Sequence, residues 1–145
     1  MALIEFQGFK WDYEEQEEHD LLGVDLKIEA GEFVGLVGPT NSGKTGLCYS
    51  IMGVVPHLSN GKVLGGKVLV DGLNTQEHSI GELSEHVGII LQNPKSQLTG
   101  AGLTIEEEVA FGLENRGFSR SEIKKRIKDV LKKVGLYDLR KRSPF

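Results

Sequence analysis

A glycine-bounded loop that joins an apolar run to a helix-like segment constrains the fold of this chain more than any other feature. The loop reads Gly38-Pro39-Thr40-Asn41-Ser42-Gly43-Lys44-Thr45, which matches the pattern G-x-x-x-x-G-K-[ST]. The continuous apolar run at residues 33–37 precedes it and is typical of a strand covered on both faces. A helical pattern follows, with Leu47, Cys48, Ile51 and Met52 on one face. This order of elements predicts a phosphate-binding loop.

The residue types in the loop suit the binding of a phosphate anion. Glycines at both ends let backbone N–H groups turn inward without a Cβ clash. A helix that begins at Lys44 directs its free N–H groups and the positive end of its dipole at the same anion. Lys44 adds a mobile positive charge for the β- and γ-phosphates, and the Thr45 hydroxyl can ligate Mg²⁺. Asn41 lies mid-loop, where we expect a positive φ.

Length and composition fit one ordinary globular domain or a piece of a larger protein. The chain has 145 residues, 39% of them hydrophobic and 26% charged. No stretch approaches the roughly 18 apolar residues of a membrane helix, and the N-terminus lacks the features of an export signal. The single cysteine, Cys48, excludes an internal disulfide, and the four histidines show no zinc-ligand spacing. We expect a cytosolic protein without a zinc site.

The net charge of −4 is unevenly distributed along the chain. From Phe118 to Phe145 there are ten Lys/Arg and three Asp/Glu, whereas the first 117 residues hold seven Lys/Arg and eighteen Asp/Glu. A basic tail can bind nucleic acid or an anionic membrane surface, or can simply be a helix with a solvated charged face. All three interpretations remain open at this point.

Patterning predicts a sheet domain over residues 1–92 and a helical segment over residues 93–145. Strands are expected at residues 4–9, 24–29, 33–37, 67–70 and 87–91, with a loop at 55–66 and a helical turn at 79–85. Thr104 with Glu107, and Ser119 with Glu122, form capping boxes that open two helices. Their inward residues are expected to be Ile105, Val109 and Leu113 in the first helix and Ile123, Ile127, Val130, Leu131 and Val134 in the second, which Gly135 ends.

Three further residues are candidates for the site, each with a simpler alternative. Tyr13 precedes the loop and could stack on a nucleobase, or could be an aromatic at a strand end. Gln92 follows the apolar run at 87–91, where it could ligate Mg²⁺ or a water, or could cap a loop. Asp71 ends an apolar strand as a metal ligand would, but Gly72 follows it, and Asp-Gly favours a hairpin turn.

Over essentially its whole length the chain resembles the ATP-binding subunits of ABC transporters. Tyr13 falls where that family keeps its adenine-stacking aromatic, residues 38–45 fall on its Walker A motif, and Gln92 falls on its Q-loop. Within the family the resemblance is strongest to the energy-coupling factor group, which includes cobalt and nickel importers. The markers are Val55-Pro56-His57, the VLVDG turn, Gln92-Asn93-Pro94 with Gln97-Leu98, and the stretch IEEEVAFG from Ile105 to Gly112.

This resemblance implies an α/β P-loop NTPase core with an antiparallel N-terminal part and the start of a helical subdomain. It implies ATP and Mg²⁺ as cofactors, with Tyr13 and residues 38–46 at the nucleotide, Lys44 and Gln92 in catalysis, and Thr45 and Gln92 at the metal. The implied partners are a second ATPase subunit, identical or not, and a transmembrane coupling subunit; nucleic acid is not expected. The implied location is the cytoplasm, peripheral on the inner face of the cell membrane, and the imported solute is a vitamin or a transition-metal ion.

The chain departs from the family pattern in three ways. Gly46 replaces a hydroxyl residue, so one contact to the α-phosphate should be missing, and residues 99–103 are slightly longer than usual. The signature sequence, the Walker B strand and the switch histidine do not occur before Phe145. We therefore expect these residues to bind Mg-ATP with little turnover. The alternatives are a nucleotide-binding interaction module that never hydrolyses ATP and a non-transport ABC protein that acts on nucleic acid.

Overall fold

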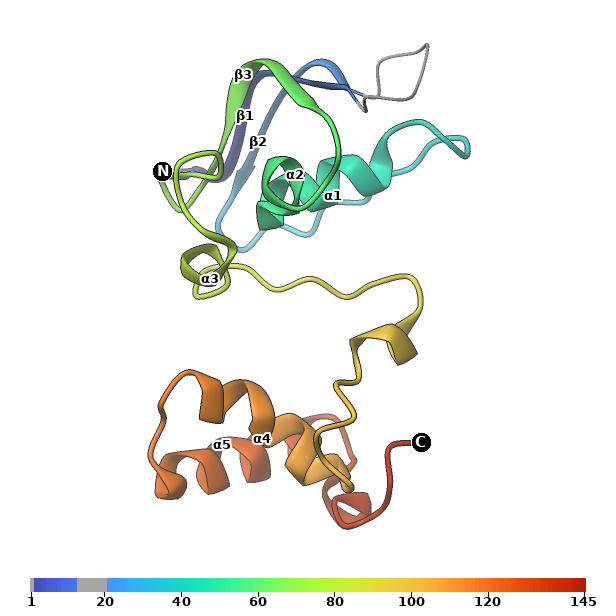
Figure 1. Cartoon of the computed structure of the whole chain (residues 1–145), viewed down its shortest axis with the longest axis vertical. Coiled ribbons are helices and arrows are strands. Elements are labelled where there is room, and N and C mark those ends of the chain that lie inside the picture. The colour runs from blue at the N-terminus through green and yellow to red at the C-terminus, as the bar shows by residue number, and fades with distance from the viewer. Residues whose placement is uncertain (1, 13–20) are drawn as a thin grey trace. The chain divides into compact units, whose positions relative to one another are not determined.

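The computed structural model describes residues 2–12 and 21–145, which form two compact units, residues 1–89 and residues 90–145 (Figure 1). Among these residues no helix is long and apolar enough to cross a membrane. The elements of the first unit are β1 (Ala2–Asp12), β2 (Leu21–Glu29), α1 (Lys44–Met52), α2 (Val54–His57), β3 (Lys62–Val70), β4 (Leu73–Asn74) and α3 (Ile80–Leu83). The elements of the second are η1 (Pro94–Gln97), α4 (Ile105–Asn115), α5 (Arg120–Lys133) and η2 (Tyr137–Leu139).

The first unit is built on an antiparallel sheet in the order β2-β1-β3-β4. The strands predicted at residues 4–9, 24–29 and 67–70 are confirmed, because alternating apolar residues place one side of each strand in a core. Asp71 and Gly72 both have positive φ, 50° and 83°, so they form the predicted hairpin turn between β3 and β4. The loop predicted at 55–66 is wrong at both ends, since α2 and the start of β3 lie there.

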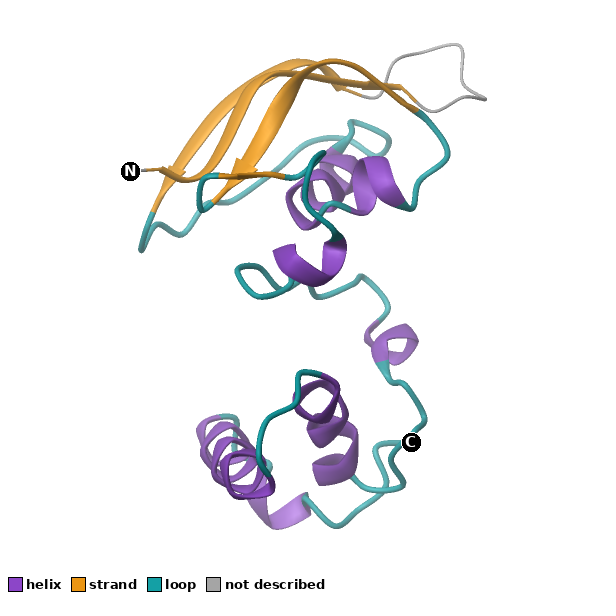
Figure 2. Cartoon of the chain, turned by 60° about the vertical axis from the view of Figure 1, so that its left-hand side comes forward, coloured by secondary structure: helices purple, strands orange, loops and turns teal. Residues whose placement is uncertain are grey.

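The core of this unit lies between the sheet and the helices α1 and α2, which cover one face of it (Figure 2). Phe6, Phe9 and Trp11 of β1 are almost fully buried against Leu47 and Val55. The prediction that Cys48 faces inward is wrong, since Cys48 is exposed. Ser50 takes a buried position instead, because its hydroxyl donates to the Gly46 carbonyl at 2.8 Å and so leaves no unpaired polar atom.

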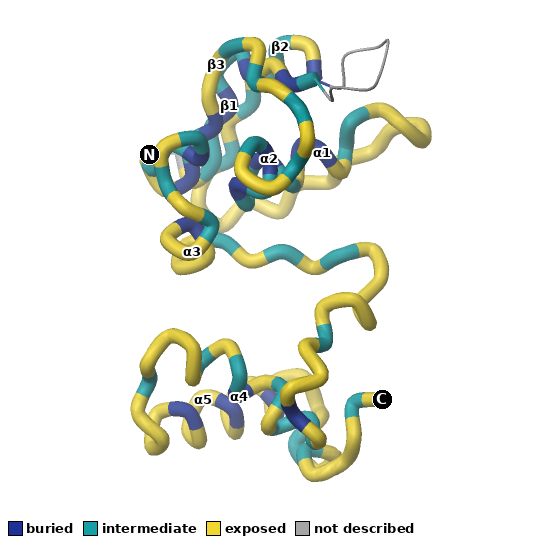
Figure 3. Tube along the Cα trace, in the orientation of Figure 1, coloured by how far each residue is buried: buried dark blue, intermediate teal, exposed yellow. Residues whose placement is uncertain are grey.

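The apolar runs at residues 33–37 and 87–91 are not strands, so two predictions from the sequence are wrong. Residues 33–37 form an extended segment before α1 that is exposed throughout (Figure 3), with Phe33 101% and Val37 90% accessible. A strand needs a neighbour to pair its backbone groups, and no described strand lies in register with either run. The apolar composition favours burial, but within the described chain nothing covers residues 33–37.

The second unit is a pair of helices around a small core of Ala110, Ile123, Ile127 and Leu131. Both predicted capping boxes are present, with the Thr104 side chain accepting from the Glu107 N–H and the Ser119 side chain accepting from the Glu122 N–H. Gly135 follows α5 with a φ of 70°, as predicted for a helix stop. Three residues predicted to face inward are more exposed than expected, because only one stripe of each helix meets the other; these residues are Val109, Val130 and Val134.

Candidate nucleotide-binding site

The loop at residues 38–43 ends in a left-handed turn that leads directly into α1. Gly43 is the N-cap of α1 with a φ of 78°, and Asn41 has a φ of 64°, which confirms the positive φ expected there. Right- and left-handed residues in succession turn neighbouring N–H groups toward a common concavity, which is the backbone form of an anion site. Asn adopts this conformation at less cost than most side chains do.

The N-terminus of α1 is open to an anion. No side chain caps it, and its first turn contains no acidic residue. The first N–H groups of a helix have no partner within the helix, and the dipole places partial positive charge there. Gly46, in this first turn, is buried, yet apart from its chain neighbours and the helix backbone no atom lies within 4 Å of the position that a Cβ would occupy. The site therefore has backbone donors and room beside residue 46.

The Lys44 ammonium lies among three oxygens of the loop. Its Nζ donates to the Gly38 carbonyl at 3.0 Å, to the Pro39 carbonyl at 2.5 Å and to the Ser42 hydroxyl at 3.2 Å. Sequence reasoning assigned Lys44 to phosphate but gave Ser42 no separate role. The hydrogen bond between Ser42 and Lys44 depends on how the loop folds back. The separation of these residues by two positions in the sequence does not reveal it.

Gly38 is required by this arrangement. A Cβ on residue 38 would lie 2.8 Å from the Ser42 Oγ, closer than side chains approach one another. The loop is thus closed around the space where the Lys44 ammonium and the Ser42 hydroxyl meet. A larger residue at position 38 would push Ser42 out of this position.

The Thr45 hydroxyl is one of two side-chain groups, with the Gln92 amide, that the sequence predicts at a metal. Thr45 is exposed in the first turn of α1, beside Lys44. Mg²⁺ usually keeps several waters and takes phosphate oxygens, so a single protein hydroxyl suits it. Among residues 2–12 and 21–145, no three His, Cys, Asp or Glu side chains gather where they could hold a metal ion. The residues present fit a nucleotide with its Mg²⁺, held by N–H groups, one ammonium and one hydroxyl.

The roles of the other two candidate residues, Tyr13 and Gln92, stay predictions. Tyr13 lies outside the described residues. Gln92 is exposed and belongs to the second unit, whose placement relative to the loop is not fixed. Its neighbour Asn93 caps η1, accepting from the Lys95 N–H at 3.1 Å, and the Leu91 N–H donates to Gln97 Oε1 at 2.8 Å. The segment around Gln92 is thus ordered by its own side chains.

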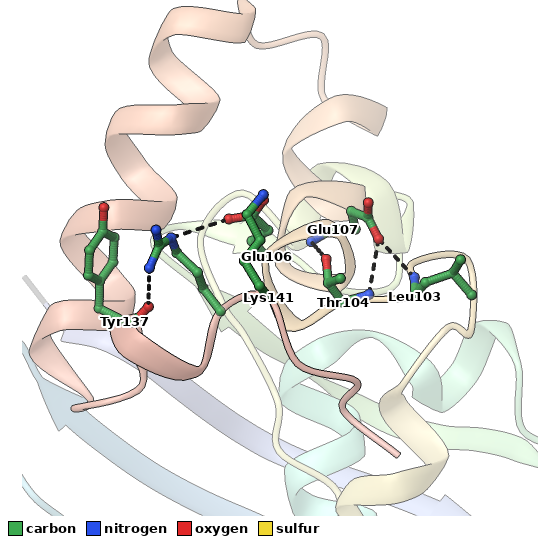
Figure 4. A network of polar contacts seen from close by, with 7 residues as sticks. Leu103, Thr104, Glu106, Glu107, Tyr137 and Lys141 are labelled. Atoms are coloured by element: carbon green, nitrogen blue, oxygen red, sulfur yellow. Dashed lines mark hydrogen bonds and ion pairs between the residues drawn. The ribbon is translucent and has the colours of Figure 1, made fainter.

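A second set of polar contacts orders α4 and the residues after α5 (Figure 4). Glu106 pairs with Lys141 and with Arg140, and Arg140 also donates to the Tyr137 carbonyl at 3.0 Å. Glu107 accepts from the backbone N–H groups of Leu103 and Thr104, both at 3.0 Å. Hydrogen bonding with the Thr104 side chain, and then with the Thr104 N–H, holds the pKa of Glu107 below its usual range. Glu106, Glu107, Tyr137, Arg140 and Lys141 also line a cavity of about 680 Å³ whose other walls are formed by α4 and α5.

A glycine-rich loop of this form, set between an extended apolar segment and a helix N-terminus, defines the fold class of P-loop nucleoside triphosphatases. The family model described as ABC transporter matches residues 21–144. The chain therefore belongs to the ABC transporter family, as an ATP-binding domain.

Two curated relatives illustrate the similarity. One is an ABC transporter ATP-binding protein of Pyrococcus abyssi whose own assignment is provisional. It is 45% identical over 144 residues, which are 99% of this chain and 50% of the relative. The other, the energy-coupling factor transporter ATP-binding protein EcfA1 of Streptococcus pneumoniae, is 34% identical over the same shares of each chain. The chain thus spans about half the length of the curated relatives it matches.

Solved structures agree in fold. CbiO1 from Clostridium perfringens, described as part of the ABC transporter complex cbiONQ, superposes with a TM-score of 0.81 at 26% identity. It covers 98% of this chain, which in turn covers 54% of CbiO1. The ATP-binding cassette MJ0796, solved as a dimer in a post-hydrolysis state with ADP and Pi, superposes with a TM-score of 0.73 at 27% identity. The superposition covers 97% of this chain and 61% of MJ0796.

Proposed function

We propose that this chain is the nucleotide-binding part of an ATPase that drives an importer of the energy-coupling factor type. The observation that carries the proposal is the loop at residues 38–45, where free N–H groups of α1, the Lys44 ammonium and the Thr45 hydroxyl lie together. The similarity to EcfA1 and to CbiO1 supports the importer group. The solute proposed from the sequence is a vitamin or a transition-metal ion.

The residues of the loop have separate roles in this proposal. The N–H groups at the start of α1 bind phosphate oxygens, and Lys44 leaves the Gly38 and Pro39 carbonyls to neutralise charge on the β- and γ-phosphates. Thr45 orients the metal ion, which supplies further positive charge when bound. Gln92 reports the γ-phosphate to a transmembrane subunit, and Tyr13 stacks on the adenine.

Assembly is part of the same proposal. Two ATPase subunits would come together on ATP, as the dimeric cassette bound to ADP and Pi illustrates for a relative. The assembly would lie in the cytoplasm against the inner face of the membrane, with a coupling subunit docked near residues 92–111. Hydrolysis requires a carboxylate that polarises water, which the family keeps at the end of its Walker B strand. Because the sequence shows no such strand in these 145 residues, they should turn over little ATP by themselves.

Thermal and chemical denaturation with and without Mg-ATP tests nucleotide binding. At a ligand concentration a hundred times Kd, binding should stabilise the first unit by about 2.7 kcal/mol. Lys44→Ala should abolish this stabilisation, because it removes the charge that neutralises the triphosphate, whereas Lys62→Ala, a matched change at an exposed lysine of β3, should retain it.

Two results would contradict the proposal. One is the absence of stabilisation in the unchanged chain at saturating Mg-ATP. The other is equal stabilisation of the Lys44→Ala variant, which would mean that nucleotide binds elsewhere. Steady ATP hydrolysis by the purified 145 residues that is lost in Lys44→Ala would overturn the expectation of little turnover while supporting the site.

A further inference from the structure

We propose that α5 carries a docking surface for the anionic headgroups of a phospholipid bilayer. The surface is the row Arg120, Lys124, Lys128 and Lys132, called here the basic row. The inference rests on the proposed function, which brings the chain to the inner face of a membrane. It adds a direct contact with lipid to the contacts made through partner proteins.

The basic row is an inclined line of positive charge that runs along the helix and partly around it. Residues four apart lie on one side of an α-helix, and twelve residues at 1.5 Å each give the row a length of about 18 Å. All four side chains are exposed. Of the two acidic residues of α5, Glu122 lies on another side of the helix, whereas Asp129 is three residues from Lys132 and adjoins only that end of the row.

Three members of the row have no partner in the part of the chain that the structure describes. Arg120, Lys124 and Lys128 make neither an ion pair nor a hydrogen bond with those residues, whereas Lys132 lies 5.6 Å from the centre of the Tyr137 ring. They line one wall of the 680 Å³ cavity between α4 and α5. Their positive charges are therefore available to a ligand outside the unit.

The acidic residues near the row do not cancel its charge. Glu106, Glu107 and Glu114 line the same cavity, but Glu106 is paired with Lys141 and Arg140, and Glu107 is held by backbone N–H groups. Five basic residues of the cavity wall face these three acidic ones; they are Arg120, Lys124, Lys128, Arg140 and Lys141. The wall keeps a net positive charge.

The form of the surface favours a lipid headgroup layer. Of the apolar residues of α5, Ile123, Ile127 and Leu131 are buried in the unit, and only Val130 is exposed, at 42%. With so little apolar surface to insert, binding would be mainly electrostatic, and each Lys or Arg near an anionic membrane contributes about fivefold in affinity. No aromatic residue belongs to the row, so it lacks the stacking platforms on which single-stranded nucleic acids are held.

Vesicle co-sedimentation of the 145-residue chain tests the proposal. The probes are mixed phosphatidylglycerol–phosphatidylcholine vesicles and pure phosphatidylcholine vesicles. Duplex DNA at equal phosphate concentration is the competitor. One variant carries Arg120→Gln, Lys124→Gln and Lys128→Gln. Its control removes the same number of charges elsewhere, through Lys62→Gln, Lys67→Gln and Lys133→Gln, all at exposed positions.

The unchanged chain and the control should bind the anionic vesicles at low salt and release them as ionic strength rises, because screening shortens the reach of the charges. The row variant should partition about a hundredfold more weakly. Equal loss in both variants would overturn the proposal, as would absence of binding to anionic vesicles or complete displacement by duplex DNA. Stabilisation by Mg-ATP should be the same in both variants, so the two proposals can fail separately.

Discussion

The Lys44 ammonium is held by the carbonyls of Gly38 and Pro39 and the hydroxyl of Ser42, and in the proposed function a phosphate group would compete for it. Nucleotide binding is therefore an exchange, in which the ammonium gives up loop oxygens and takes phosphate oxygens. The net free energy of nucleotide binding is smaller than the charge of the ligand alone would suggest, because the hydrogen bonds of the ammonium are replaced rather than added to. In this proposal the affinity for nucleotide depends on the residues that contact it besides Lys44, and Gly46 is predicted to be one of them.

Adding a hydroxyl at position 46 should strengthen ATP binding. Gly46 is buried in the first turn of α1 and, apart from its chain neighbours and the helix backbone, has no atom within 4 Å of its missing Cβ, so a small side chain fits. A hydrogen bond to a charged group contributes about 1.5 kcal/mol, or roughly tenfold in Kd. We expect Gly46→Ser to lower the Kd for ATP by about this factor, as measured by isothermal titration calorimetry.

The matched control for this prediction is Gly46→Ala. Both substitutions restrict the helix backbone relative to glycine, which stabilises the fold by up to about 1 kcal/mol. Only serine also adds a hydrogen-bond donor. Equal affinities of the serine and alanine variants for ATP would show that residue 46 does not reach the nucleotide.

At the scale of single elements, local sequence was a sound guide wherever a few neighbouring residues determine the geometry. The boxes at Thr104 and Ser119 were predicted from residues three apart, and the Asp71–Gly72 turn from a dipeptide. The apolar run at 33–37 was predicted to be a strand and is not, because strand pairing depends on a distant partner that composition does not reveal. The same limit applies to Gln92, whose relation to the loop depends on how two units are placed.

The capping box of α4 should make stability depend on pH. Hydrogen bonds from the Thr104 side chain and backbone lower the pKa of Glu107 in the folded chain relative to the unfolded one. The stabilisation is therefore present above the unfolded pKa and is lost as pH falls through the lower folded pKa. We expect Glu107→Gln to be less stable than the unchanged chain at neutral pH and nearly equal to it once the pH lies below both pKa values, in urea unfolding followed by circular dichroism.

A suitable control is Glu114→Gln, which removes a carboxylate from the other end of α4. Glu114 is exposed and takes no part in the capping box, so its substitution should change the pH dependence little. A stability difference between the Glu107→Gln variant and the unchanged chain that did not vary with pH would show that the box is not formed in solution.

At the scale of the whole molecule, the chain has more apolar surface than its own described strands can cover. Phe33, Val34, Leu36 and Val37 are all exposed in one extended segment, next to a loop that the site needs in a defined shape. The curated relatives are about twice as long as this chain. Exposed extended apolar segments pair with other chains, so the isolated 145 residues should associate with themselves.

Replacing two of these residues should reduce the self-association. We expect Phe33→Asp with Val37→Asp to lower the concentration-dependent increase in sedimentation coefficient measured by analytical ultracentrifugation, because charge opposes pairing of the segment. The control is Leu22→Asp with Leu58→Asp, which changes two exposed apolar residues outside the segment, 71% and 74% accessible. Association that persists in the first variant and disappears in the control would contradict the role of residues 33–37.

The exposure of the same segment has a consequence inside a cell. Hsp70-type chaperones and quality-control proteases recognise short, extended, uncharged stretches, and the amount of a protein at steady state depends on how often it presents one. A polypeptide that left residues 33–37 bare would be captured and degraded in competition with its own maturation. The abundance of such a polypeptide should therefore rise when residues 33–37 are covered.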